Sequence, residues 1–273
     1  MSFRVDPVRG DFAQAAASYD AAAVLARETG RRMAERLDYV KIEPRRVADI
    51  GCATGDGIRE LQRRYPRALP LALDYARPML RAARARTPRL QRMTGRGPRW
   101  VNADARELPL AGNSLGLAWS NLMLHWLNDP LPVFREVRRV LEVGGLFMFA
   151  TLGPDTLKEL RAAGATDLRA FPDMHDLGDQ LVAAGFADPV MDMEMLTLTY
   201  RQPHHFLRDQ RHLGVRDGLL GHLGWRQWRQ VLSRWPREEG LLPARFEIVY
   251  GHAWKGEPKA APDGRAVIKL HRS

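Results

Sequence analysis

The sequence feature that most constrains the fold of this chain is a glycine-rich turn, which lies between an apolar segment and a segment with a helical pattern. Residues 46–51 read RVADIG, the pattern of a short buried strand, and residues 56–66 predict a helix that ends before Pro66. The run between them is Gly51-Cys-Ala-Thr-Gly55-Asp-Gly57. Glycines here allow a sharp turn and a close approach of the backbone to a ligand. Such a strand–turn–helix unit predicts a nucleotide-like ligand at the carboxyl end of a parallel sheet.

The residue that precedes the turn indicates the charge of this ligand. The spacing Gly-x-x-x-Gly-x-Gly after Asp49 differs from the Gly-x-Gly-x-x-Gly of dinucleotide-binding turns. A carboxylate beside the turn would repel a pyrophosphate. It suits a cationic ligand, such as the amino group and sulfonium of S-adenosylmethionine.

Strands and helices alternate through the first half of the chain. The apolar patterns predict strands at 68–74, 99–103, 115–121 and 146–152, and helices at 11–38, 78–86 and 130–141. Gly144-Gly145 is expected to end the last helix, and residues 87–99 to form a surface loop. This alternation predicts a parallel sheet with helices on both faces.

The second half has a different pattern, with helices expected at 154–163, 173–185, 203–213 and 225–235 and long strands at 189–200 and 245–255. Trp225, Trp228 and Trp235 share one helical face, which is more often core than a ligand site. We expect an N-terminal helical cap over residues 1–40 and a cofactor-binding core over 41–152. Residues 153–256 should complete the same domain, and 257–273 should form a tail.

Polar side chains follow three further predicted strands. Asp74 comes about twenty residues after the turn, where a carboxylate can accept hydrogen bonds from both ribose hydroxyls, and a solvated turn acid is the less favoured alternative. Asp104-Ala105 is placed to contact the exocyclic amine of an adenine, and Asn121 is placed to contact the reactive end of the ligand. Each signal is modest alone, and their common register makes them a strong pattern.

Composition limits the class of protein and its partners. The 273 residues carry 42 Lys plus Arg against 32 Asp plus Glu, a formal charge of +10. This excess indicates either an anionic partner or an arginine-rich proteome. Cys52 is the sole cysteine, which excludes an internal disulfide or a cysteine zinc site and suits a reducing cytoplasm. No apolar run reaches the roughly 20 residues of a membrane span, so we expect a cytoplasmic protein without one.

Residues 46–152 resemble the motifs of class I S-adenosylmethionine-dependent methyltransferases, with Ala53 where glycine is commoner and Val143 where proline is usual. The resemblance implies an α/β, Rossmann-like fold with a mostly parallel seven-stranded sheet, helices on both faces and a helical substrate-side insertion. It also implies S-adenosylmethionine as cofactor, without a metal. The implied cofactor-binding residues are Asp49, Gly51, Ala53, Gly55, Asp74, Tyr75, Met79, Asp104, Ala105 and Asn121.

Segments outside these motifs resemble the malonyl-acyl-carrier-protein O-methyltransferase family of biotin synthesis. They are FAQAAASYDAAAVLARETGRRMAERLDYV, LAWSNLMLHWLNDP, ATLGPDTLKELRAA, PDMHDLGDQLVAAGFADPVMDME and LTLTYRQPHHFLRDQRHLG. That family methylates the free carboxylate of a malonyl thioester on acyl carrier protein, an acidic partner that would account for the positive charge. GATDLRA, between Ala163 and Phe171, is shorter than the family's usual connection over the active site.

The resemblance implies roles for four more residues. Tyr19 should fold over the cofactor and border the methyl group, and His125 should lie near the mouth of the site and orient the substrate. Both could instead be core residues. Arg201 and Arg208 are candidates for binding malonate or the phosphate of the carrier's prosthetic arm, although most such arginines are simply solvated.

Three other readings stay open, and one of them is a non-catalytic binding protein that keeps only the cofactor site. Arginine-hydroxylating assembly factors of complex I share segments like SNLMLHW, DTLKEL and DLGDQLVAAGF. A nucleic-acid methyltransferase would also suit the basic charge, but Ser120-Asn-Leu-Met stands where amino-methylating enzymes have Asn/Asp-Pro-Pro-aromatic. Pyrimidine C5 methylation needs a cysteine in another loop, so nucleic acid is the less favoured partner.

Overall fold

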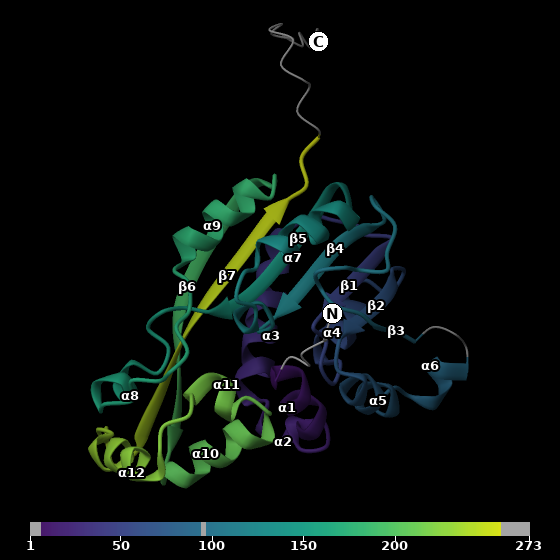
Figure 1. The fold of residues 1–273 in the computed structure, drawn as a ribbon. Coiled ribbons are helices and arrows are strands. Elements are labelled where there is room, and N and C mark those ends of the chain that lie inside the picture. The colour runs from purple at the N-terminus through teal and green to yellow at the C-terminus, as the bar shows by residue number, and fades with distance from the viewer. Residues whose placement is uncertain (1–6, 94–96, 258–273) are drawn as a thin grey trace, which may run out of the picture.

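A seven-stranded sheet forms the centre of the molecule in the computed structural model, which describes residues 7–93 and 97–257 (Figure 1). Its strand order is β3-β2-β1-β4-β5-β7-β6. The strands are β1 (Arg46–Ile50), β2 (Leu69–Asp74), β3 (Arg99–Asn102), β4 (Leu115–Asn121), β5 (Leu141–Leu152), β6 (Ala187–Tyr200) and β7 (Leu242–Trp254). Strands β1 to β5 pair in parallel, whereas β7 is antiparallel to both β5 and β6. The predicted mostly parallel α/β fold is confirmed.

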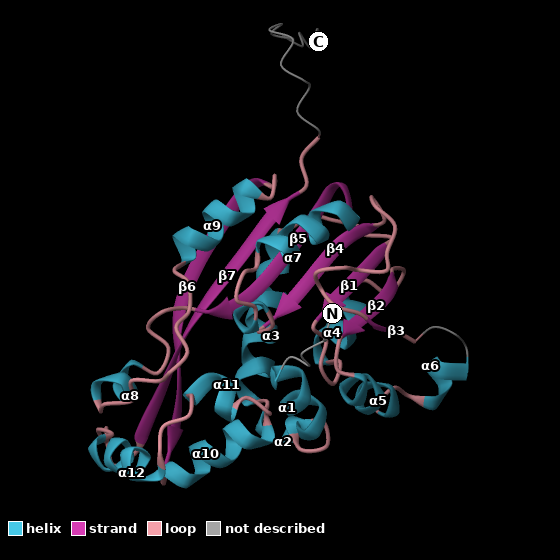
Figure 2. Ribbon diagram, in the orientation of Figure 1, coloured by secondary structure: helices cyan, strands magenta, loops and turns pink. Residues whose placement is uncertain are grey.

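Helices cover both faces of this sheet (Figure 2). The first half of the chain contributes α3 (Val24–Arg36), α4 (Asp56–Arg64), α5 (Arg77–Ala85), α6 (Arg89–Met93) and α7 (Leu131–Val140), and the second half adds α9 (Met174–Ala183). Met33, Ile58 and Leu61 from α3 and α4 pack with Trp119 of β4 on one face. Phe134 and Val137 of α7 pack with Phe147 of β5 on the opposite face. Because both faces are covered, the central strands are nearly continuously apolar, as parallel strands usually are.

A helical cap lies beyond the carboxyl ends of β1 and β4 (Figure 1). It consists of α1 (Pro7–Ala15), α2 (Tyr19–Ala22), α10 (Pro203–His212) and α11 (Arg216–Leu220), with α8 (Lys158–Ala162) and α12 (Trp225–Arg234) near the far ends of β6 and β7. Helix α2 packs against α10, so the cap joins an N-terminal segment to helices from the second half of the chain.

The prediction of one continuous helix over 11–38 is wrong. The Ser18 hydroxyl donates hydrogen bonds to the backbone oxygens of Ala15, at 3.2 Å, and His212, at 3.1 Å. Such side-chain bonds compete with helical ones, and the chain breaks between α1 and α2. A second break follows at Ala23, and a short 3-10 turn at 37–39 ends the segment. These breaks turn Tyr19 toward the sheet's carboxyl edge.

Other boundaries also differ from the prediction. Strand β5 starts at Leu141, before the two glycines, because Gly144 pairs through its N–H with the backbone oxygen of Lys255. Helix α8 begins late because the Leu157 N–H is held by the backbone oxygen of Arg245 at 2.6 Å. Helix α6 occupies part of the expected 87–99 loop, of which residues 94–96 lie outside the described residues, and α11 was not predicted.

The tryptophan face of α12 is only partly core. Trp235 is buried and donates its indole N–H to the Pro243 backbone oxygen at 2.8 Å, and Trp228 is half-buried. Trp225 is 76% exposed because it lies in the first turn of α12, so its expected core role is wrong. Most of the expected 257–273 tail falls outside the described residues. No helix in the described part of the chain is long and apolar enough to cross a membrane.

Candidate active site

The glycine-rich turn after β1 has the backbone geometry that its sequence requires. Gly51 and Gly55 have φ values of 79° and 85°, in the left-handed region that favours glycine. A Cβ on Gly51 would lie 2.5 Å from Cγ of Met123, so the turn also needs the space. The N–H groups of Gly51 and Cys52 donate to the backbone oxygen of Leu73 at 2.9 and 3.0 Å, which ties the turn to β2.

Asp74 at the end of β2 closes this turn from the other side. Its Oδ2 accepts a hydrogen bond from the Ala53 N–H at 2.9 Å, and its Oδ1 accepts one from the Ala76 N–H at 2.8 Å. Burial raises the pKa of Asp74 to about 6 although both bonds favour the ionised form. Each oxygen keeps a lone pair for a ligand, because a carboxylate has about four acceptor positions.

Asp49 lies behind the turn. Its side chain is 2% exposed, and burial raises its pKa to about 7, with the nearby Asp74 and Asp56 charges adding to the effect of burial. A Cβ on Gly57 would lie 2.6 Å from Oδ2 of Asp49 and 3.0 Å from the indole nitrogen of Trp119. Gly57 therefore lets α4 start directly against this carboxyl group.

A cavity of about 900 Å³ opens in front of the turn, at the carboxyl edge of the sheet. The structure brings most of the sequence-predicted cofactor residues to its wall, namely Gly51, Ala53, Asp74, Tyr75, Met79, Asp104, Ala105 and Asn121. Asp49 and Gly55 shape the turn without lining the cavity. Asp104 forms an ion pair with Arg106 at 2.6 Å, and Asn121 donates from Nδ2 to the Ala26 backbone oxygen at 2.7 Å.

A second, smaller chamber of about 70 Å³ adjoins this cavity under the helical cap. Both spaces share the side chains of Phe12, Tyr19, Leu122 and Trp126 as walls. Leu122 has a φ of 53°, a strained value for leucine, so the chain departs from β4 sharply at this shared wall. Tyr19 thus stands between the two spaces, and burial raises the pKa of its phenol well above the ordinary range.

His125 lines the small chamber and is 5% exposed. Its buried Nδ1 has no hydrogen-bond partner among the described residues. Burial, reinforced by the Arg169 charge, lowers the pKa of His125 to about 3. The imidazole is therefore neutral near pH 7 and can donate a hydrogen bond without carrying a charge.

The short 163–171 connection supplies a residue that the sequence interpretation missed. Arg169 lines the larger cavity and donates from Nε to the His125 backbone oxygen at 2.9 Å. Its guanidinium carbon lies 5.8 Å from the Trp126 ring centroid, and the Phe171 ring lies 5.7 Å from that of His125. Although the connection is short, it therefore still supplies side chains that contact His125 and Trp126 at the site. The arginine in GATDLRA was the sequence signal that could have identified this site residue.

The two arginines proposed to bind substrate lie elsewhere. Arg201 and Arg208 are exposed, and neither lines the cavity or the chamber. The Arg208 Nε is 3.9 Å from Oδ1 of its neighbour Asp209. Any contact that they make with a substrate is therefore outside these two spaces.

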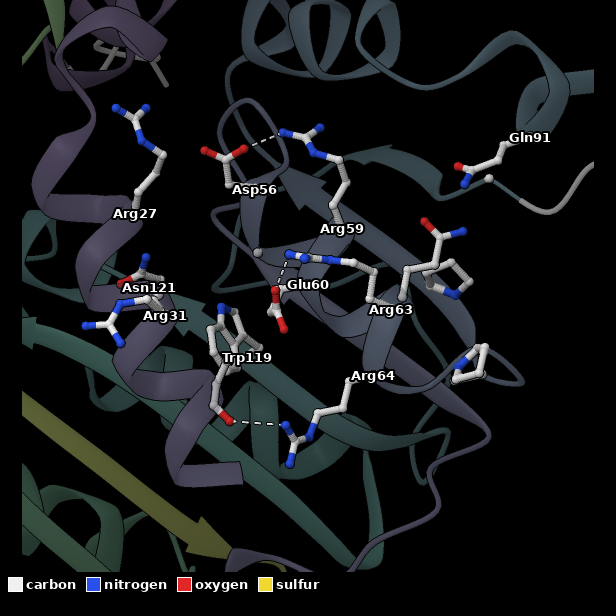
Figure 3. A pocket seen from close by; sticks show the side chains of 18 of the residues that line it. Arg27, Arg31, Asp56, Arg59, Glu60, Arg63, Arg64, Gln91, Trp119 and Asn121 are labelled. Atoms are coloured by element: carbon white, nitrogen blue, oxygen red, sulfur yellow. Dashed lines mark hydrogen bonds and ion pairs between the residues drawn. The ribbon is translucent and has the colours of Figure 1, made fainter. Parts of the chain in front are cut away.

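A third hollow, a groove of about 1340 Å³ between α3 and α4, is lined by many of the chain's arginines (Figure 3). Most of them face an acid: Arg59 pairs with Asp56 at 2.5 Å and Arg63 pairs with Glu60 (Figure 3). Arg64 pairs with Asp38 at 2.5 Å. Their charge is thus largely balanced within the protein. The groove is a weaker anion site than its arginine content indicates.

The fold and the cavity together define a class I S-adenosylmethionine-dependent methyltransferase. A family model described as a methyltransferase domain matches residues 48–149. The cavity fits the cofactor, because a carboxylate ends β2 where ribose hydroxyls would bind and a second acid lies behind the turn for a cationic ligand.

The chain belongs to the malonyl-[acyl-carrier protein] O-methyltransferase family. A relative of that name from Laribacter hongkongensis is 49% identical over 97% of this chain and 95% of its own length. Among solved structures, the YcgJ protein of Bacillus subtilis has a TM-score of 0.61 and 16% identity, covering 85% of this chain and 99% of that one. A Haemonchus contortus phosphoethanolamine N-methyltransferase, solved with S-adenosylhomocysteine, has a TM-score of 0.52 and 18% identity over 83% of this chain and 53% of its own. These structures share the fold.

Proposed function

We propose that this protein methylates the free carboxylate of a malonyl group carried on acyl carrier protein, a step that would prime pimelate synthesis for biotin. The observation that carries the proposal is the chamber beside the cofactor cavity, which offers buried neutral donors. Among the described residues that line it, none is a lysine or an arginine. The name of the 49% identical relative supports the same substrate.

A chamber without cations suits this reaction. Bound S-adenosylmethionine would supply an electrophilic methyl group, and its transfer to a carboxylate oxygen would leave an ester and the thioether of S-adenosylhomocysteine, with neither the carboxylate nor the sulfonium charge remaining. A guanidinium at about 4 Å would stabilise the ionised carboxylate by about 4 kcal/mol at the effective dielectric constant of a protein site. That stabilisation would be lost as the charge is consumed, so it would raise the barrier.

The chain's own groups then act by positioning. The malonyl carboxylate is ionised at pH 7 and needs no general base. Tyr19, at the wall shared by the two spaces, would border the reacting groups and donate a hydrogen bond from its protonated phenol. Neutral His125 would donate to a substrate oxygen from the chamber side. Both contacts would orient the carboxylate while the apolar walls exclude water.

The carrier protein would bind outside the two spaces. Acyl carrier proteins are acidic, and Arg208 on α10 and Arg201, just before that helix, are both exposed. We propose that these arginines contact the carrier or the phosphate of its prosthetic arm rather than the malonyl group. A cytoplasmic location follows from the proposed pathway. Nucleic acid is a poorer partner, because many arginines of the α3–α4 groove are already paired.

The test is methyl transfer from labelled cofactor to malonyl-acyl carrier protein by the purified chain. We expect a base-labile methyl ester on the malonyl group, and Tyr19→Phe should lower turnover. Absence of transfer to any malonyl thioester would sink the proposal, and hydroxylation of a protein arginine would establish the assembly-factor alternative. Malonyl-coenzyme A, run in parallel, measures how much the carrier contributes.

A further inference from the structure

Gln210 of α10 is a buried polar residue that the cofactor site leaves unused. It is 3% exposed and lines the small chamber beside Tyr19 and His125. Its backbone oxygen accepts a hydrogen bond from the Val215 N–H at 3.0 Å. Its side-chain amide makes no hydrogen bond with another described residue, and its polar atoms are not among those that the protein encloses completely. Because buried amides are nearly always paired, an unpaired one at a cavity wall indicates a ligand.

The lining of the same chamber contains a second unpaired polar group. The buried Nδ1 of His125 also lacks a partner in the described part of the chain. His125 comes from the turn after β4 and Gln210 from α10, so two segments far apart in the sequence bring unpaired groups to one space. The rest of the lining is mainly apolar, including Phe12, Leu198 and Phe246.

The size of the chamber limits what these groups can hold. About 70 Å³ accommodates a few non-hydrogen atoms, since one water molecule needs on the order of 10–15 Å³ by this measure. A carboxylate with its neighbouring methylene fits, and a longer acyl chain does not. Four residues line both the chamber and the cofactor cavity, so a ligand in the chamber lies next to the bound cofactor.

Asp209 is the one acid among the described residues that line this chamber, and its carboxylate interacts with other side chains of the protein. Its carboxylate interacts with the Tyr200 hydroxyl and lies 3.9 Å from the Arg208 Nε. An ionised substrate would therefore meet the amide of Gln210 rather than an open carboxylate.

We propose that Gln210 is the specificity-determining residue of this chamber, where its amide N–H groups bind the terminal carboxylate of a short dicarboxylic acyl group. The inference rests on the proposed function, and it adds that a residue of α10 determines which acyl group the enzyme accepts. Acyl groups that lack the second carboxylate leave the amide and the imidazole unpaired and are rejected, because burying unpaired polar groups is costly.

The experiment compares malonyl- and acetyl-acyl carrier protein as ligands of the full chain in the presence of S-adenosylhomocysteine. The wild-type protein should bind the malonyl form at least tenfold more tightly. Gln210→Leu should remove most of that preference and lower kcat/KM for malonyl carrier by about 10- to 100-fold, the usual effect of losing a hydrogen bond to a charged group. Its cofactor affinity and melting temperature should stay close to those of the wild type.

Gln230→Leu is the matched control, because Gln230 is exposed on α12 and lines neither space. If Gln210→Leu does not fold, Gln210→Met, with a side chain of the same length, takes its place. The ¹⁵N resonance of the wild-type Gln210 side-chain amide should also shift with malonyl carrier and not with acetyl carrier. An unchanged malonyl preference in the folded variant, or no selective shift, would overturn the inference. Absence of methyl transfer by the wild-type chain would instead count against the proposed function.

Discussion

The carboxylate of Asp74 accepts a 2.9 Å hydrogen bond from the backbone N–H of Ala53, a residue with a φ of 43°. The bond joins the end of β2 to the tip of the glycine-rich turn. It fixes the turn at the place where the cofactor's ribose would bind. The geometry of the turn and the position of the carboxylate therefore depend on each other.

Asp74→Asn should weaken cofactor binding at least tenfold. An amide has one oxygen, so its NH₂ group would face either the Ala53 or the Ala76 N–H, and one donor would be left unpaired. Isothermal titration with S-adenosylhomocysteine measures the change. Asp179→Asn, an exposed substitution on α9, is the control, and equal affinities for the two variants would contradict the assignment.

Ala53→Gly should stabilise the protein. A left-handed backbone costs alanine about 1–2 kcal/mol, part of which glycine loses again in the unfolded chain. We expect a gain of about 0.5–1 kcal/mol and a rise in melting temperature of about 1–3 °C. Ala82→Gly, at a half-buried position inside α5, should instead lose about 0.5–1 kcal/mol. A destabilised Ala53→Gly protein would show that the turn is not strained there.

Cofactor affinity should fall as the pH is lowered from 8 to 5.5. The pKa of Asp49 is about 7 and that of Asp74 about 6, so both carboxyl groups titrate within this pH range. A cationic ligand binds the ionised form, and protonation of Asp49 alone should weaken binding roughly 30-fold at pH 5.5. Asp49→Asn should bind more weakly at pH 8 and show a flatter profile.

The same pKa values make an opposite prediction for the ligand-free protein. A carboxyl group whose folded-state pKa is raised favours folding when protonated, so its contribution is present at low pH and is lost as the pH rises from about 4 through 7. Asp49→Asn should therefore stabilise the ligand-free protein at pH 8 by about 1–3 kcal/mol and much less at pH 5. Chemical denaturation at the two pH values tests this, and a destabilised variant at pH 8 would refute it.

Turnover at saturating cofactor should show no histidine titration. The pKa of His125 is about 3, so the imidazole stays neutral from pH 6 to 9 and acts as a donor throughout. His125→Gln keeps an N–H donor and should lose less activity than His125→Phe, by about tenfold. A step in kcat near pH 6.5 that vanishes in His125→Gln would show that the histidine is instead a general base.

Sequence patterns predicted the cofactor side of this site because it is built locally. Asp74, Asp104 and Asn121 each follow a strand directly, and parallel strands bring their carboxyl ends to one edge. The substrate side depends on contacts between distant segments. The break at Ser18 involves the His212 backbone oxygen, 194 residues away, and Gln210 meets the chamber only because α10 packs on α2. No local periodicity contains that information.

The position of β7 has a consequence for how the chain acquires its structure. The last strand of the described residues is an interior strand of the sheet, paired along one side with β5 and along the other with β6. Until residue 254 has left the ribosome, β5 therefore exposes an unpaired edge beside the nascent cofactor site. Such edges are prone to wrong pairing, and closing a gap of about a hundred residues is slow. Chains interrupted before β7 should aggregate during synthesis, even though they contain every residue that lines the larger cavity.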